Sequence, residues 1–165
     1  MARYVVVMPL APLERGDEFT VADWPLHVTV VEPFESAASP EQLVSALQPV
    51  AGRAHVVRTT AGENAMFGRR RDVPVSLIRD GGEIVALREA ALAALAAAGL
   101  DLGRVRPDFR PHVTVKRHGR LYPGDHVAFD RLALIDMRPP AGSRHRAVVG
   151  VLSLDPEPSR HPDPP

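Results

Sequence analysis

The tetrapeptide His-Val-Thr-Val occurs twice in this chain, at 27–30 and at 112–115. Side chains along a β-strand alternate between two faces, so each copy separates a polar His–Thr face from an apolar Val–Val face. The valines need a core to pack against, and the opposite face is free to line a groove. The repeat therefore predicts two amphipathic strands, with His27 beside Thr29 on one and His112 beside Thr114 on the other.

Short segments rich in Val and Ile predict the remaining strands. The predicted strands are 3–8, 26–31, 54–60, 73–78, 111–117, 126–137 and 146–154. They alternate with two predicted helices and no linker divides them, so we expect a single domain over 1–154. The tail at 155–165 is polar and rich in proline, a composition that predicts disorder.

Two segments carry helix signals. The first, 39–50, opens with Ser39 as N-cap, a proline in the first turn and Gln42 as the partner of a capping box. In the second, 82–99, apolar residues recur at helical spacing and Gly99 ends the helix. The apolar positions of this second helix are Ile84, Leu87, Ala91, Leu95 and Ala98.

Composition narrows the possible chemistry. The 165 residues include no cysteine, which excludes disulfides, thiolate catalysis and cysteine-ligated metals. The 20 basic and 20 acidic residues cancel, so overall charge does not indicate a nucleic-acid or membrane partner. No apolar segment is long enough to cross a bilayer. We expect a cytoplasmic monomer that uses neither a metal nor a cofactor.

Two His–Thr pairs suit displacement at phosphorus. The attacking and leaving oxygens lie on opposite sides of the phosphorus. A neutral imidazole on one side can therefore take a proton from water, while a protonated imidazole on the other side gives a proton to the leaving oxygen. Histidine titrates near neutrality, which lets both forms coexist. The threonine hydroxyls can donate to the non-bridging oxygens. The residues alone do not say which histidine is the acid.

The segments "LHVTVVEPF" (26–34) and "FRPHVTVKR" (109–117) resemble the paired motifs of the 2H phosphoesterase superfamily. This superfamily includes bacterial 2′-5′ RNA ligases and RNA 2′,3′-cyclic phosphodiesterases. The segments 66–78 and 146–154 resemble its middle region and its closing strand. The sequence "VVEPFE" after the first motif departs from the apolar stretch ending in Gly that many relatives carry.

The resemblance implies an α+β fold of two pseudo-symmetric lobes, with antiparallel sheets facing a central groove and helices outside. It implies metal-independent hydrolysis of 2′,3′-cyclic phosphates on RNA ends or nucleotides, with 2′-5′ ligation as the possible reverse reaction. On this resemblance His27 and His112 are catalytic, and Thr29, Thr114 and Arg117 bind the phosphate.

Several other side chains are weaker candidates. Trp24 and Phe67 could stack on a base, although core packing is the alternative for each. Lys116 is expected on the strand face away from the histidines, exposed to solvent. The exposed "GRRR" at 68–71 could contact an RNA backbone. Two alternatives to an enzyme remain: an RNA- or nucleotide-binding module with a degenerate groove, and a structural protein in which the repeat is coincidental.

Overall fold

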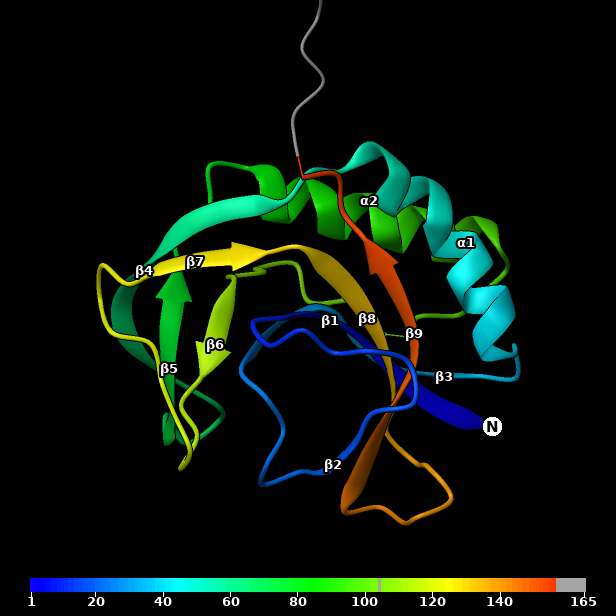
Figure 1. The fold of residues 1–165 in the computed structure, drawn as a ribbon, viewed down its shortest axis with the longest axis horizontal. Coiled ribbons are helices and arrows are strands. Elements are labelled where there is room, and N and C mark those ends of the chain that lie inside the picture. The colour runs from blue at the N-terminus through cyan, green and yellow to red at the C-terminus, as the bar shows by residue number, and fades with distance from the viewer. Residues whose placement is uncertain (104, 157–165) are drawn as a thin grey trace, which may run out of the picture.

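Antiparallel strands form one curled sheet, and two helices cover its outer face (Figure 1). The computed structural model describes residues 1–103 and 105–156. The predicted disorder of the tail falls mainly on 157–165, outside the described residues. The strands are β1 (Ala2–Pro9), β2 (Glu18–Thr20), β3 (His27–Ser36), β4 (Val57–Phe67), β5 (Val73–Ile78), β6 (His112–Thr114), β7 (His126–Phe129), β8 (Arg131–Asp136) and β9 (His145–Ser153), and the helices are α1 (Pro40–Arg53) and α2 (Glu83–Ala97).

The predicted α+β class with antiparallel strands is confirmed. The strand order β2-β9-β8-β1-β3-β6-β5-β4-β7 divides into a first half, from β2 to β3, which combines strands from both ends of the chain, and a second half, from β6 to β7. Because the sheet curls, these halves face each other as the two expected lobes, yet they remain one continuous sheet (Figure 1). The β3–β6 pair is thus the junction between the lobes.

The predicted elements were found, with different limits. The expected strand 126–137 is two strands, β7 and β8, interrupted at Asp130. The expected strand 111–117 is shorter, because β6 covers three residues and the chain then turns. The short strand β2, which pairs with β9 at the sheet edge, was not predicted.

The main core lies between the sheet and the helices. Val28, Val30 and Val113 are buried in it, as the repeat predicted, whereas Val115 lies beyond the end of β6 and is half-buried. A smaller cluster on the other face of the first half of the sheet includes Val7 and Trp24. Since the valines face the helices, the His–Thr face of both motifs points to the concave side of the sheet.

Helix ends follow the predicted signals. The Ser39 side chain accepts from the Gln42 amide at 3.2 Å, and the Ser39 amide donates to the Gln42 side chain at 2.8 Å, so the capping box is confirmed. At α2, Asp80 accepts from three backbone amides of the first turn, a cap that sequence reasoning missed. Of the predicted apolar positions of α2, all are buried except Ala98, which lies beyond the last helical residue and is exposed.

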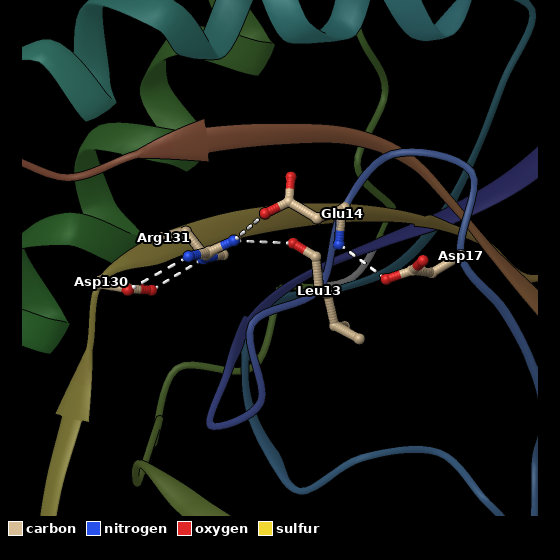
Figure 2. Close-up of polar contacts among 5 residues, drawn as sticks. All are labelled: Leu13, Glu14, Asp17, Asp130 and Arg131. Atoms are coloured by element: carbon tan, nitrogen blue, oxygen red, sulfur yellow. Dashed lines mark hydrogen bonds and ion pairs between the residues drawn. The ribbon is translucent and has the colours of Figure 1, made fainter.

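Arg131 helps to hold the long connection from β1 to β2. Arg131, at the start of β8, donates to the Leu13 carbonyl at 2.9 Å and to the Glu14 carboxylate at 2.9 Å, while Asp130 accepts from its Nε at 2.8 Å (Figure 2). The hydrogen bond from Arg131 lowers the pKa of the Asp130 carboxyl. These bonds hold the segment that leads toward Trp24 and the first motif.

Helix α1 packs closely on β9 at Gly150, which yields a test of the packing. A Cβ at Gly150 would overlap the side chain of Val44. We expect Gly150→Ala to lower the free energy of unfolding by about 1–3 kcal/mol, as overpacking does in a filled core. In the control Gly52→Ala, within α1, the added methyl meets nothing within 4 Å, and stability should rise by about 0.5–1 kcal/mol. Urea unfolding measures both, and equal stability of the two variants would contradict the packing.

Candidate active site

The two motifs lie side by side on neighbouring strands. β3 and β6 are antiparallel, and Val28 is the Cα partner of Val113. In that register His27 lies opposite Thr114, and Thr29 lies opposite His112, all on the concave face. Opposite Cβ atoms in such a pair are about 5 Å apart and diagonal positions about 7–8 Å apart. The two imidazoles and the two hydroxyls therefore occupy alternate corners of one four-residue cluster.

The two histidines are held in the same way. Nδ1 of His27 lies 2.8 Å from the Pro25 carbonyl oxygen, and Nδ1 of His112 lies 2.8 Å from the Arg110 carbonyl oxygen. A carbonyl only accepts, so in each ring Nδ1 carries the hydrogen and Nε2 is left for a ligand. The matching bonds, each to the residue two positions earlier, give the cluster a local twofold symmetry.

The surroundings of the two rings differ. The His27 ring stacks on the buried indole of Trp24, with ring centroids 4.3 Å apart and planes at 24°. Burial lowers the pKa of His27 to about 4, against the effect of the bond to Pro25, and the nearby charge of Lys116 lowers it further. His27 is thus neutral at pH 7 in the free protein.

His112 lies against an aromatic edge and an arginine-rich segment. Its ring meets Phe67 in an edge-to-face contact with centroids 4.5 Å apart, and the Arg110 guanidinium lies 5.4 Å from the centre of the Phe67 ring. Burial lowers the pKa of His112, and the positive charges of Arg106 and Arg110 act in the same direction. Phe67 is half-buried beside this histidine, at the end of β4.

The predicted site residues do not all gather in the cluster. His27, Thr29, His112, Thr114 and Phe67 do, whereas Trp24 lies behind His27 with 8% of its surface exposed.

Arg117 and Lys116 occupy the turn that follows β6. Arg117 is exposed in this turn, which Lys116 and Gly119 close. The expectation for Lys116 was wrong. Its side chain is half-buried, and it lies close enough to His27 for its charge to lower the pKa of that histidine. Strict alternation from Thr114 would have placed Lys116 on the histidine face.

The departure after the first motif has a structural explanation. Glu32, in "VVEPFE", forms a two-pronged ion pair with the buried Arg88 of α2, at 2.6 and 2.9 Å. Arg88 also donates to the carbonyls of Val30 and Arg106, and its guanidinium lies 4.4 Å from the centre of the Phe109 ring. This arginine therefore links β3 to the segment that leads into the second motif.

One cavity lies away from the histidine pair. It has a volume of about 690 Å³ and lies on the helical side of the sheet, between α1 and α2, lined by residues such as Val50, His55 and Leu87. A second one, of about 370 Å³, lies on β4 and β7 around His126. Neither contains the histidine pair, but a concave sheet face is open to solvent and need not enclose a cavity. The cavity between α1 and α2 has a mainly apolar lining, whereas the cluster at β3 and β6 carries the paired imidazoles and hydroxyls.

Over residues 1–103 and 105–156, no group of three or more His, Asp or Glu side chains is arranged to hold a metal ion. Within the same ranges, no helix is long and apolar enough to cross a membrane.

The family model described as "2′-5′ RNA ligase superfamily" matches residues 9–141, which include both motifs and the strands that carry them. The chain belongs to this superfamily. No curated protein matches the sequence. The family assignment agrees with the resemblance of the two motifs to the 2H phosphoesterases, and it makes the paired His–Thr cluster the natural candidate for the active site of this 2′-5′ RNA ligase superfamily member.

Solved structures share the fold at low sequence identity. A crystal structure described as a phosphoesterase is 19% identical, with a TM-score of 0.64 over 94% of this chain and 99% of that one. Escherichia coli LigT in complex with 3′-AMP is 21% identical, with a TM-score of 0.62 over 93% and 98%. The protein TT0787 of Thermus thermophilus is 18% identical, with a TM-score of 0.64 over 95% and 100%. LigT is also known in complexes with NADP+, ATP and phosphate.

The environment of His27 predicts how the protein responds to acid. A histidine whose pKa is depressed by folding stabilises the native state above its unfolded pKa of 6.5, and that contribution is lost as pH falls toward about 4. We expect the NMR titration midpoint of His27 near pH 4, and that of His112 below 6.5. The free energy of unfolding should fall over this range, and less steeply in His27→Gln. A His27 midpoint near 6.5 would contradict the described burial.

Proposed function

We propose that the protein is a metal-independent phosphodiesterase that opens 2′,3′-cyclic phosphates on RNA ends or nucleotides by acid–base catalysis between His27 and His112. The observation that carries the proposal is the Val28–Val113 register, in which His27 lies opposite Thr114 and Thr29 lies opposite His112. Four such groups match the needs of a single phosphoryl group.

Each group has a role in the proposed reaction. One Nε2 takes a proton from the attacking water, and the other Nε2, in its protonated form, gives a proton to the departing ribose oxygen. Thr29 and Thr114 donate to the non-bridging oxygens as negative charge develops there. The bonds to Pro25 and Arg110 keep both rings in the tautomer that this requires. If the 5′-hydroxyl of a second RNA took the place of the water, the same proton transfers would join the two RNA ends through a 2′-5′ bond and free the 3′-hydroxyl.

Substrate charge is part of the proposed mechanism. Both histidines have lowered pKa values in the free protein, so the acid must gain its proton as the anionic phosphate binds. The negative charge of a bound phosphate raises the pKa of a neighbouring histidine and so favours its imidazolium form. Hydrolysis measured as kcat/KM should therefore be favoured below pH 6.5, and the optimum of kcat should lie at a higher pH than that of kcat/KM.

The nucleoside is expected to lie toward Phe67. This ring is half-buried beside His112, and the guanidinium of Arg110 lies over it. A base or ribose attached to the phosphoryl group could pack there. E. coli LigT has been crystallised with 3′-AMP and with phosphate, which supports a nucleotide as the kind of ligand. The arginines at 69–71 are exposed at the β4–β5 turn, and they are candidates for contact with a longer RNA.

The proposal is tested by turnover of 2′,3′-cyclic nucleotides and of a short RNA ending in a cyclic phosphate. We expect His27→Gln and His112→Gln each to reduce kcat by at least about 100-fold, the usual contribution of a positioned acid or base. His126→Gln, on the exposed side of β7, is the matched control and should keep parental activity. Parental rates in both site variants would exclude the mechanism. Binding of a nucleoside 2′-phosphate without any turnover would instead favour a nucleotide-binding module.

The local symmetry of the cluster allows either histidine to be the acid, and the leaving group distinguishes them. The nitrophenolate group of a nitrophenyl phosphodiester leaves as a stable anion and needs no proton from the enzyme. With this substrate, the variant that lacks the acid should recover most of the parental rate, whereas the variant that lacks the base should stay slow. Equal losses in both variants on both substrates would contradict a division of labour between the rings.

A further inference from the structure

Lys116 extends the His–Thr cluster along β6. It follows Thr114 by two positions, so alternation sends its side chain to the same concave face as His112 and Thr114. The backbone remains tied to the sheet beyond β6, since the Val115 amide donates to the Pro74 carbonyl at 3.0 Å. Lys116 and Gly119 then exchange backbone bonds of 3.0 and 3.3 Å and close a turn. The lysine therefore leaves the sheet at the edge of the cluster.

The ammonium of Lys116 lies near the indole that stacks on His27. Nζ of Lys116 lies 5.9 Å from the centre of the Trp24 ring, and that ring lies 4.3 Å from the His27 ring. The Trp24 carbonyl in turn accepts from the ring of His118, which belongs to the turn after Lys116. The His118 bond thus holds the turn against Trp24, just before the first motif, and Lys116 lies beside this contact.

The charge of Lys116 has no acidic counterpart nearby. Among the ion pairs of the described residues, none involves Lys116. Its neighbours are a second cation, Arg146, whose guanidinium carbon lies 5.4 Å from the Trp24 ring centre, and the imidazole of His27. Burial and the charge of Arg146 both lower the pKa of Lys116. A half-buried ammonium beside another cation is unfavourable until an anion joins them.

Arg117 differs from Lys116 in its burial. It is exposed at the corner of the turn, where its charge is solvated. A solvated guanidinium gains little from contact with an anion, since water screens the interaction. The two adjacent cations therefore have different surroundings, although the family resemblance points to Arg117.

We propose that Lys116 is the cationic binding residue for the phosphoryl group of the substrate, and that Arg117 is not. The inference rests on the proposed function, because it takes the His–Thr cluster as a phosphoester site. Lys116 would donate from Nζ to a non-bridging oxygen on the His27 side of the cluster. Burial is the main cause of the lowered pKa of His27, and the charge of Lys116 adds to it until a bound anion offsets that charge.

Calorimetric binding of inorganic phosphate and of a nucleoside 2′-phosphate tests this directly. We expect Lys116→Gln to weaken both by about tenfold or more, which is the effect of losing a charge-assisted hydrogen bond. Lys116→Arg should restore most of the affinity, and Arg117→Gln should leave it within about twofold, as for an exposed charge. Unchanged affinity in Lys116→Gln, or a larger loss in Arg117→Gln, would overturn the proposal.

A second measurement is independent of substitution. Lys116 is the sole lysine of the sequence, so reductive methylation with carbon-13 formaldehyde gives one lysine NMR signal, distinct from that of the terminal amine. The signal should shift on addition of phosphate, and its titration midpoint should rise, because an adjacent anion favours the ammonium form. A lysine signal whose chemical shift does not change at saturating phosphate would overturn the proposal, even if Lys116→Gln were unstable.

Different experimental results would contradict this proposal and the proposed function. If cyclic phosphates are hydrolysed in a histidine-dependent way while Lys116→Gln binds phosphate normally, the inference about Lys116 alone is wrong. If no variant or parent hydrolyses any cyclic phosphate but phosphate binding depends on Lys116, the binding residue stands and catalysis is wrong. Thermal unfolding of each variant shows whether a loss reflects binding or folding.

Discussion

The pairing of β3 with β6 is the constraint on which the site depends. It sets Val28 opposite Val113, and it is the junction between the two halves of the sheet. A shift of one residue would turn the His–Thr face of one strand into the core and bring its valines to the surface. The buried valines oppose such a shift, and β6 is further held by β5, where Leu77 pairs with His112 and Val75 with Thr114. Core packing on one face thus fixes the chemical groups on the other.

The two histidines of the cluster have matching backbone hydrogen bonds but different neighbouring side chains. The backbone gives the two histidines the same bond to the residue two positions earlier, so both present Nε2 in the same way. The side chains around them differ: His27 lies on an indole with Lys116 near it, and His112 lies at the edge of a phenyl ring beside arginines. A symmetric arrangement suits a phosphoryl group approached from two sides, and unequal surroundings allow the two rings to hold protons differently.

The sequence predicted what depends on local alternation. The two strands, their polar and apolar faces and the capping box at Ser39 all follow from spacing, and all were found. Strand neighbours depend on the whole chain, so the direct pairing of the motifs could not be predicted from either one. The Arg88–Glu32 pair, separated by 56 residues, gave no local signal. The stack of Trp24 on His27 likewise depends on how the preceding loop folds back. Lys116, in contrast, could have been placed correctly by the same alternation that placed Thr114.

Phosphate binding followed at both histidines at once tests the central claim most directly. The protein contains seven histidines, and single Gln variants assign the signals of His27 and His112 in NMR spectra. Titration with a nucleoside 2′-phosphate should shift both ring signals with one common dissociation constant and a stoichiometry of one. Shifts with two different constants, or a response of one ring alone, would mean that the two imidazoles do not share a phosphoryl group.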